Sequence, residues 1–266
     1  MSETYISLEQ QGAVATVWLE RPEVHNAFNA DLIRQLKDCF VALNQRDDVR
    51  VVVLAGRGKS FSAGADLNWM KAAGAASEVE NQADAQQLAD MLYALATLKQ
   101  PTIARVQGAA MGGGMGLAAT CDICIAGDKA MFATSEVRLG LAPSTISPYV
   151  IRAIGERQAQ RYFLTAERIS AAKAAEIGLA HEVVGMEELD AKVEEIVAAL
   201  LLGGPVAQQA SKQLIALVAK RDNSAELRSQ TAAHIASVRA GQEAKEGLNA
   251  FLEKRAAAWC NSANPT

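Results

Sequence analysis

Residues 111–116 read Met-Gly-Gly-Gly-Met-Gly, inside a stretch that otherwise has the composition of a helix. Residues 105–108, shortly before them, read as a strand end. Each glycine in a helix costs about 1 kcal/mol relative to alanine, so four glycines in six positions need an explanation. A helix that begins here has unpaired N–H groups, which a ligand can approach closely. The segment predicts either a binding site for a phosphate or a developing oxyanion, or a glycine-rich packing crossover.

Around this segment, strand-like and helix-like stretches alternate through the first half of the chain, and the last quarter is helical. Alternation of this kind is typical of α/β layers. The residue pattern predicts strands at 5–11, 14–20, 50–56, 102–108, 122–127, 130–133 and 181–184. It predicts helices at 31–44, 80–98, 146–165, 170–177, 186–201, 206–221, 224–240 and 242–258, and a short helix opened by the glycines.

The segment 201–205, Leu-Leu-Gly-Gly-Pro, is the best candidate for a boundary between two parts of the chain. We therefore expect a core over residues 1–200 and a helical C-terminal segment over residues 201–266.

The composition excludes several classes of protein. Lys plus Arg number 26 and Asp plus Glu number 30, so the net charge of −4 argues against a nucleic-acid partner. The N-terminus lacks the pattern of a secretory signal. The most apolar region, 103–126, is interrupted by Arg105, Gln107 and glycines, so it does not predict a membrane span. We expect a soluble cytoplasmic protein with no membrane partner.

Cys121 and Cys124 have a spacing found in redox and zinc sites. A structural zinc ion needs four ligands, and no second pair or His cluster accompanies these two residues. We expect no metal, and we predict that both cysteines are small buried apolar residues. Asp122, which follows Cys121, is expected to cap or pack at a join between helix and strand.

A second loop of small residues, Phe-Ser-Ala-Gly-Ala-Asp-Leu at 61–67, follows another predicted buried strand. It also offers exposed N–H groups with little side-chain bulk. Glu136 lies in a turn-like segment and is a candidate carboxylate. Two such loops, one carboxylate and no His, Cys or metal cluster together suggest a reaction through a stabilised anion.

These residues carry a resemblance to the enoyl-CoA hydratase/isomerase (crotonase) superfamily, over nearly the whole chain. The matching segments, in order and at ordinary spacing, are 21–29, 56–67, 101–127, 133–143, 164–184 and 246–255. The resemblance implies an α/β fold in which strand-strand-helix units spiral into two roughly perpendicular sheets, followed by a helical C-terminal part. It implies an acyl-CoA thioester as substrate and no cofactor, because coenzyme A is part of the substrate.

By motif position, the resemblance assigns two backbone N–H groups that bind the thioester oxygen to Ala65 and Gly113. Charge develops on that oxygen when water adds to a 2-enoyl thioester, and each preorganised donor is worth a factor of about 10² to 10³ in rate. Glu136 matches a catalytic acid/base of the family.

One position departs from the pattern. Hydratases of the family typically carry a first glutamate two residues after the glycine triplet, and this chain has Gly116 there. One interpretation is a hydratase in which Glu136 is the main acid/base and hydroxyls at residues 144, 145 and 147 help to hold water. The alternatives are a Δ3,Δ2-enoyl-CoA isomerase with a single Glu base, and a CoA-binding member without catalysis.

The segment 142–155, with residues 62–70 and Gly116, is similar to the form found in bacterial hydratases of methylglutaconyl-CoA in leucine breakdown. Hydratases of related glutaconyl-CoA thioesters are close to these. Such substrates carry a distal carboxylate, which calls for a cation or hydroxyl donors. Arg138 and Arg152 are the candidate cations.

The resemblance also implies where the rest of the acyl-CoA binds. The expected residues are Ala27, Ala63, Asp66, Leu67, Gly112, Phe251 and Lys254, the last two reaching the nucleotide part of CoA, often next to a neighbouring subunit. A homotrimer or hexamer is expected, with residues 201–266 as the oligomerisation segment.

Overall fold

A computed structural model describes residues 3–219 and 221–261. Its larger sheet has the strand order β1-β2-β3-β4-β6-β9. The first two strands form an antiparallel hairpin, and the following pairs are parallel. The strands are β1 (Ile6–Gln11), β2 (Val14–Leu19), β3 (Val51–Gly56), β4 (Thr102–Val106), β6 (Ile123–Gly127) and β9 (Glu182–Val184).

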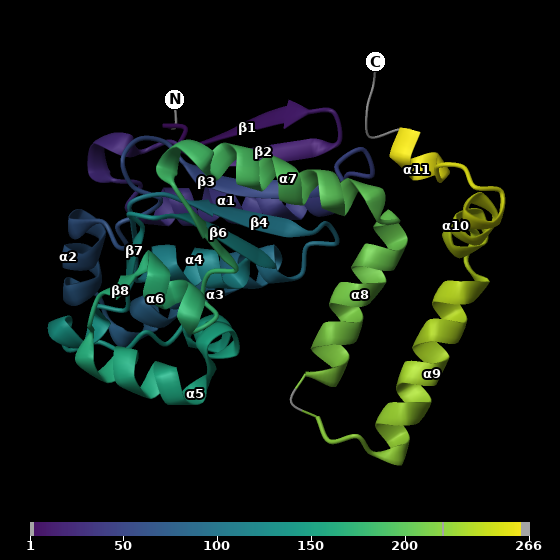
Figure 1. The fold of residues 1–266 in the computed structure, drawn as a ribbon. Coiled ribbons are helices and arrows are strands. Elements are labelled where there is room, and N and C mark those ends of the chain that lie inside the picture. Colours follow the sequence, from purple (N-terminus) through teal and green to yellow (C-terminus); the bar gives the residue numbers. More distant parts are fainter. Residues whose placement is uncertain (1–2, 220, 262–266) are drawn as a thin grey trace.

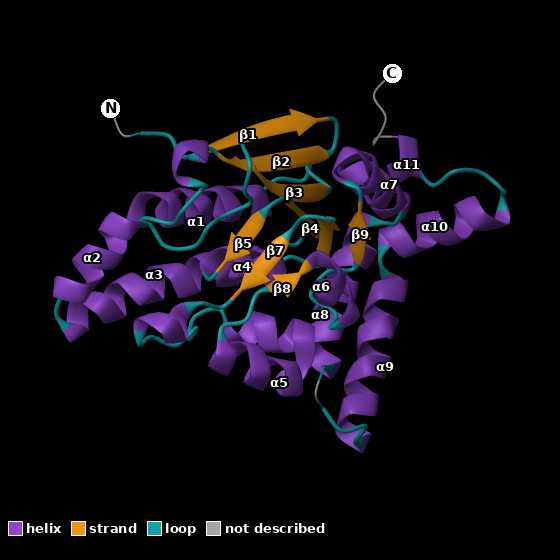
Figure 2. Ribbon diagram, turned by 60° about the vertical axis from the view of Figure 1, so that its left-hand side comes forward, coloured by secondary structure: helices purple, strands orange, loops and turns teal. Residues whose placement is uncertain are grey.

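A smaller sheet lies beside β4 (Figure 2). It has the order β5-β7-β8 and consists of β5 (Ala109–Met111), β7 (Met131–Ala133) and β8 (Ile169–Ser170). The chain passes from β4 to β5 through Gly108, which has a φ of +57°. A Cβ atom there would lie 2.0 Å from the carbonyl oxygen of Lys59, so a glycine lets the two segments run in contact.

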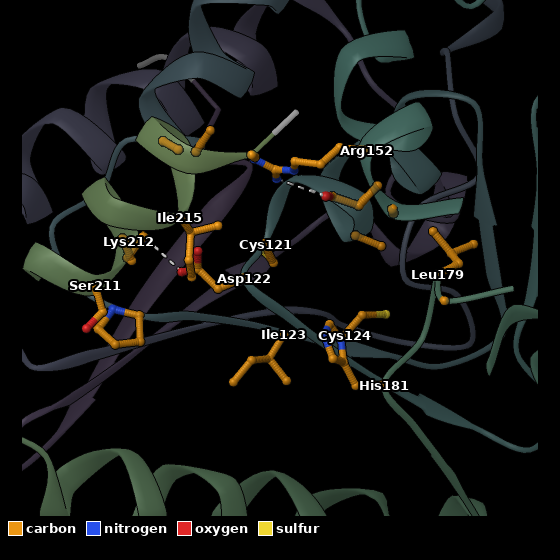
Figure 3. A pocket seen from close by; sticks show the side chains of 18 of the residues that line it. Cys121, Asp122, Ile123, Cys124, Arg152, Leu179, His181, Ser211, Lys212 and Ile215 are labelled. Carbon is orange, nitrogen blue, oxygen red and sulfur yellow. Dashed lines mark hydrogen bonds and ion pairs between the residues drawn. The ribbon is translucent and has the colours of Figure 1, made fainter. Parts of the chain in front are cut away.

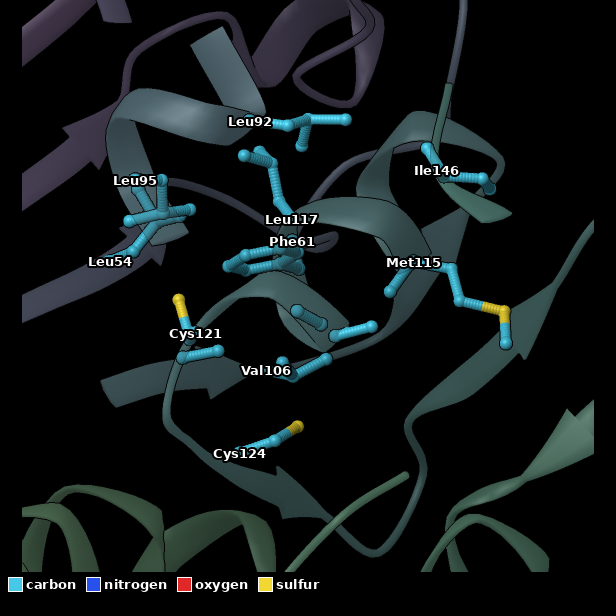
Figure 4. Packing of buried hydrophobic residues seen from close by; sticks show 14 of the residues in the cluster. Leu54, Phe61, Leu92, Leu95, Val106, Met115, Leu117, Cys121, Cys124 and Ile146 are labelled. Carbon is cyan, nitrogen blue, oxygen red and sulfur yellow. The ribbon is translucent and has the colours of Figure 1, made fainter. Parts of the chain in front are cut away.

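Helices cover both faces of the larger sheet (Figure 1). On one face, α1 (Ala30–Asn44), α3 (Glu78–Ala96), α4 (Gly113–Thr120) and α5 (Ser147–Thr165) enclose the main core. Figure 4 shows side chains of α3 and α4 packed against Leu54 of β3 and Val106 of β4. On the other face, α7 (Leu189–Leu202) packs over a second group of buried residues that includes Val53, Ile103 and Ile125.

The residue pattern explains why α1 forms where it was predicted. The side chain of Asn29 accepts a hydrogen bond from the backbone N–H of Leu32 and so caps the first turn. Leu32, Leu36, Phe40 and Leu43 recur at helical spacing and are all buried.

The remaining helices of the core are α2 (Leu67–Ala75), α6 (Ala171–Glu176), η1 (Pro22–Val24), η2 (Glu136–Leu139) and η3 (Met186–Glu188).

The C-terminal helices α8 (Pro205–Val218), α9 (Ala225–Ala240), α10 (Gln242–Leu252) and α11 (Ala258–Asn261) extend to one side of the sheet (Figure 1). Arg50, just before β3, connects this side to the core. Its guanidinium donates hydrogen bonds to the carbonyls of Leu201 and Trp259, both at 3.1 Å, and to that of Gly203.

Among the described residues, no helix combines the length and apolar character that crossing a membrane requires.

Most predicted elements are confirmed, with shifted ends. The elements that were missed include α2, whose first turn is capped by Asp66, and the short strands β5 and β8 of the smaller sheet. The predicted helix 242–258 is confirmed as far as Leu252, and its extension to 258 is wrong, because the chain leaves the helix there and Lys254 adopts a φ of +55°. Residue 220, inside the predicted helix 206–221, lies outside the described residues, as do residues 262–266 of the predicted C-terminal segment. The proposed boundary at 201–205 coincides with the turn between α7 and α8, and a division into two domains stays a prediction.

Candidate active site

The two loops of small residues lie in contact. Ser62 forms a parallel bridge with Ala110 of β5. The N–H of Ser62 donates to the carbonyl of Ala109 at 2.9 Å, and the N–H of Met111 donates to the carbonyl of Ser62 at 2.9 Å. The loop at 61–67 is therefore held along the strand that leads directly into the glycine triplet.

A second bridge directs the backbone of Ala65. The N–H of Phe28 donates to the carbonyl of Gly64 at 2.6 Å, and the N–H of Asp66 donates to the carbonyl of Phe28 at 2.8 Å. Because the groups on either side of Ala65 face Phe28, the N–H of Ala65 itself points away from Phe28. Ala65 is exposed, and its N–H donates to no acceptor among the described residues.

Gly113 supplies a second available N–H. It is the first residue of α4, so its N–H has no acceptor within the helix and lies at the positive end of the helix dipole. A Cβ atom at Gly113 would lie 2.6 Å from Cε2 of Phe28. Phe28 therefore contacts both donor segments: its backbone hydrogen-bonds to the residues on either side of Ala65, and its ring lies against Gly113.

Glu136 lies at the same place. It begins η2, and its Oε1 is 3.1 Å from the position that a Cβ atom at Gly112 would occupy. That position is 4.0 Å from Cα of Gly64, so the carboxylate and both loops meet within a few ångströms. The Oε2 atom of Glu136 is buried and has no hydrogen-bond partner among the described residues. Burial raises the pKa of this carboxyl above its ordinary value.

The space beside Gly116 is filled. A Cβ atom there would lie 2.2 Å from Cγ2 and 2.8 Å from Cβ of Ile146, which is 2% exposed. The chain therefore replaces the glutamate that hydratases of the family typically carry with an apolar contact, and any side chain at Gly116 would require Ile146 to move.

The hydroxyls near Ile146 are engaged mostly within their own loop. Ser147 Oγ donates to the carbonyl of Ser144 at 2.8 Å, and Ser144 Oγ lies 3.5 Å from the carbonyl of Ala142. Thr145 Oγ1 makes no hydrogen bond with another described residue. The start of this loop is joined to Glu136 by a hydrogen bond: the N–H of Leu141 donates to the Glu136 carbonyl at 3.0 Å. Thr145 is thus the freest of the three hydroxyls predicted to hold water.

Several residues predicted to bind acyl-CoA adjoin these loops. Ala27 is buried next to Phe28, and Ala63 donates its N–H to the carbonyl of His25 at 2.9 Å. Leu67 is 81% exposed at the start of α2. Asp66 caps α2 through the N–H of Asn68 at 2.9 Å, so its carboxylate already has a structural role. Their contact with a substrate stays a prediction.

Phe251 and Lys254 are not brought to the loops within one chain. Both are exposed at the end of α10, and Phe251 is 79% exposed. In Figures 1 and 2, α10 and α2 lie at opposite sides of the molecule. Their approach to a site at Ala65 and Gly113 from a neighbouring copy, as the resemblance implies, stays a prediction.

A cavity of about 610 Å³ lies at the other end of α4. It is bounded by the end of α4, the start of β6 and α8 (Figure 3). Two of its charged groups pair with each other: Lys212 Nζ lies 2.7 Å from Asp122 Oδ2, which also accepts from the N–H and hydroxyl of Thr102 at 2.8 and 2.9 Å. The predicted packing role of Asp122 is confirmed. We place the candidate site at Glu136 instead, because its carboxylate oxygen is the one left without a partner.

Cys121 and Cys124 border that cavity as free, buried thiols. Burial raises the pKa of Cys124 to about 12 and also raises the pKa of Cys121. The prediction that both act as small apolar residues is confirmed.

The two candidate cations lie apart from each other. Arg152 lines the cavity, and its Nη2 lies 3.5 Å from the carbonyl of Ala119 at the C-terminal end of α4. Arg138 is exposed in η2, two residues after Glu136, and makes no ion pair with another described residue. Of the two, Arg138 is the one that lies on the Glu136 side of the helix.

Sequence reasoning missed two residues that shape the site: Phe28 and Ile146. Phe28 lies in the segment 21–29, but no residue pattern reveals that its ring lies against Gly113. Ile146 lies 30 positions after Gly116 in the sequence, so their contact follows only from the way that α5 packs on α4.

Comparisons with known proteins agree with this geometry. A family model described as "Enoyl-CoA hydratase/isomerase" matches residues 9–262. A crotonyl-CoA hydratase of Syntrophomonas wolfei is 35% identical over 97% of this chain and 98% of its own. A short-chain-enoyl-CoA hydratase of Clostridium acetobutylicum is 33% identical over 94% of this chain and 95% of its own. The crystal structure of an enoyl-CoA hydratase from Shewanella pealeana is 40% identical, covers 96% of each chain and has a TM-score of 0.94.

Proposed function

Because the chain belongs to the enoyl-CoA hydratase/isomerase family, we propose that it adds water to the double bond of a 2-enoyl-CoA thioester. The chain is an enzyme of the enoyl-CoA hydratase class. The observation that carries the proposal is the unpartnered carboxylate of Glu136 next to two loops that each offer an available N–H. This arrangement suits a reaction that moves a proton while negative charge develops on a carbonyl oxygen.

In the proposed reaction, the N–H groups of Ala65 and Gly113 donate to the thioester oxygen. Water attacks C3 of the enoyl group and gives a proton to the Glu136 carboxylate. The electrons of the double bond move to the thioester oxygen, and the resulting enolate collapses as Glu136 returns a proton to C2. The net change is addition of H and OH across the double bond, and coenzyme A leaves with the product as part of the thioester.

We propose 3-methylglutaconyl-CoA, or a related glutaconyl-CoA, as the substrate. The support is the similarity of the segment 142–155 to hydratases of such thioesters, together with the exposed guanidinium of Arg138 near Glu136. A cation at that place can bind the distal carboxylate of the acyl group.

A Δ3,Δ2-enoyl-CoA isomerase is the second candidate, and a specific observation favours it. Ile146 fills the space beside Gly116, so the site has one carboxylate where hydratases of the family typically have two. One carboxylate is enough to take a proton from C2 of a 3-enoyl thioester and return it to C4.

The remaining acyl-CoA contacts are proposed at Ala27, Ala63, Asp66, Leu67 and Gly112, which lie on or beside the two loops. We also propose a homotrimer or hexamer, in which Phe251 and Lys254 reach the site of a neighbouring copy. The exposed apolar side chains of the C-terminal helices support an assembly: Val206, Ile215, Ile235, Leu248, Phe251 and Leu252.

The test is an assay of the purified protein and its Glu136→Gln variant on crotonyl-CoA, 3-methylglutaconyl-CoA and a 3-enoyl-CoA. We expect hydration by the wild type, fastest with the dicarboxylic acyl group, and little by the variant. Movement of the double bond without uptake of water selects the isomerase. Tight CoA binding without turnover selects a binding protein, and full turnover by Glu136→Gln contradicts the proposed chemistry.

A further inference from the structure

Arg21 is a buried cation close to the first of the two loops. It lies between β2 and η1 and is 8% exposed. Its Nη1 donates to the carbonyl of Ala27 at 2.5 Å, and its Nη2 lies 3.0 Å from Asp66 Oδ2. The guanidinium also lies over the ring of Tyr5, with 4.7 Å between Cζ and the ring centroid. One planar group thus joins two segments that are far apart in the sequence.

The two partners of Arg21 flank the bridge that directs Ala65. Ala27 comes directly before Phe28, and Asp66 comes directly after Ala65. The backbone of Phe28 bonds to Gly64 and Asp66, so both strands of this short bridge are also joined through Arg21. The bridge consists of few hydrogen bonds, so a guanidinium that joins its strands limits how far the Ala65 N–H can turn.

We propose that Arg21 is a positioning residue for the hydration reaction, which holds the N–H of Ala65 on the thioester oxygen by joining Ala27 to Asp66. This inference rests on the proposed function. Arg21 acts through Ala65 and does not itself touch the substrate.

Stability alone gives a weak reason for such a group. The desolvation of a buried ion pair offsets much of its attraction, so an apolar replacement is often neutral for folding. Arg21 Nε has no hydrogen-bond partner among the described residues, which adds to the cost of burying it. The N–H donors of a guanidinium lie in one fixed plane, so the group can bind two acceptors in defined directions. In this bridge the two acceptors are the Ala27 carbonyl and Asp66 Oδ2.

Asp66 has two roles that can be separated. Its Oδ1 accepts from the N–H of Asn68 and caps α2, while its Oδ2 pairs with Arg21. Asparagine caps helices about as well as aspartate, so Asp66→Asn keeps the cap and removes the charge of the pair.

The experiment compares wild type with Arg21→Met, Arg21→Lys and Asp66→Asn. Each is assayed for kcat and KM with crotonyl-CoA, and Raman difference spectra record the carbonyl stretch of a bound, slowly reacting enoyl-CoA. The matched control is Lys212→Met, which removes a partly buried ion pair at the far end of α4. Tm is measured for every variant.

We expect Arg21→Met to lower kcat by about ten- to a hundredfold, the size of effect that a small misplacement of a reacting group produces. KM should change little, and the carbonyl band should move toward that of the free thioester. Arg21→Lys should restore part of kcat, because a lysine can hold one of the two acceptors. Lys212→Met should lower Tm and leave kcat and the band unchanged.

The positioning role would be overturned if Arg21→Met and Asp66→Asn lowered Tm but left kcat and the carbonyl stretching band unchanged. If Arg21→Met does not fold, the same criterion is applied to Arg21→Lys and Asp66→Asn. Failure of the proposed function looks different: the wild type itself would not hydrate an enoyl-CoA, or Glu136→Gln would retain full activity.

Discussion

The two ends of helix α4 are built in opposite ways. At its N-terminal end, Gly113 has an N–H without an acceptor in the helix, and Glu136 has a carboxylate oxygen without a partner. At its C-terminal end, Asp122 accepts from Thr102 and pairs with Lys212. The carboxylate near the second end is satisfied within the protein, whereas the carboxylate and the N–H near the first are left for something else to bind. An unpartnered buried group costs stability, so its retention points to function.

The largest expected effect tests the unpartnered carboxylate. Glu136→Gln should lower kcat by about 10² to 10⁴, because the site loses the group that accepts and returns the proton. KM should change little, since glutamine has nearly the same shape. Steady-state hydration assays measure both constants. In the wild type, kcat should fall as the pH drops through the raised pKa of Glu136, and the variant should lack this step.

The next effect tests the N–H at the start of α4. Gly113→Ala should lower kcat by about 10² to 10³, the usual loss of one oxyanion donor, because the new Cβ would lie 2.6 Å from Phe28 and displace the helix start. The matched control is Gly74→Ala in α2, where a Cβ atom meets nothing within 4 Å. Equal activity of both variants would remove Gly113 from the proposed oxyanion site.

A third variant tests the filled space beside the glycines. Gly116→Glu should lower the free energy of unfolding by about 1–3 kcal/mol through overpacking against Ile146, without raising the hydration rate. Denaturant titrations measure the change. A faster hydratase from the single variant would show that Ile146 moves aside easily.

The smallest effect is the contribution of Glu136 to stability. Its pKa is raised in the folded state, so the folded protein binds this proton more tightly than the unfolded chain. Stability from this group is therefore present at low pH and is lost as the pH rises through the raised pKa. The Tm of Glu136→Gln minus that of wild type should increase from pH 4 to pH 8. A difference that is constant with pH would contradict the burial of an uncompensated carboxylate.

Local patterns predicted α1, the first hairpin and the paired loops, because spacing, caps and small residues are properties of neighbouring positions. The candidate groups Ala65, Gly113 and Glu136 were placed by family motifs, and the structure brings their segments together.

The features that the sequence did not reveal depend on contacts between residues that are distant in the sequence. The ring of Phe28 against Gly113, the guanidinium of Arg21 across two loops and the contact of Ile146 with Gly116 all arise from packing of separate elements. The break after Leu252 was missed because an unusual φ at a lysine has no composition signal.

The hydrogen bonds of Arg50 have a consequence for shortening the chain. Its guanidinium is mostly enclosed and donates to carbonyls near residues 201–203 and to that of Trp259. A fragment that stops at residue 200 deprives this cation of every one of those acceptors at the edge of the sheet. Residues after 200 thus complete the hydrogen bonds of a buried cation of the core, and we expect separate expression of residues 1–200 to give a product that aggregates or is degraded.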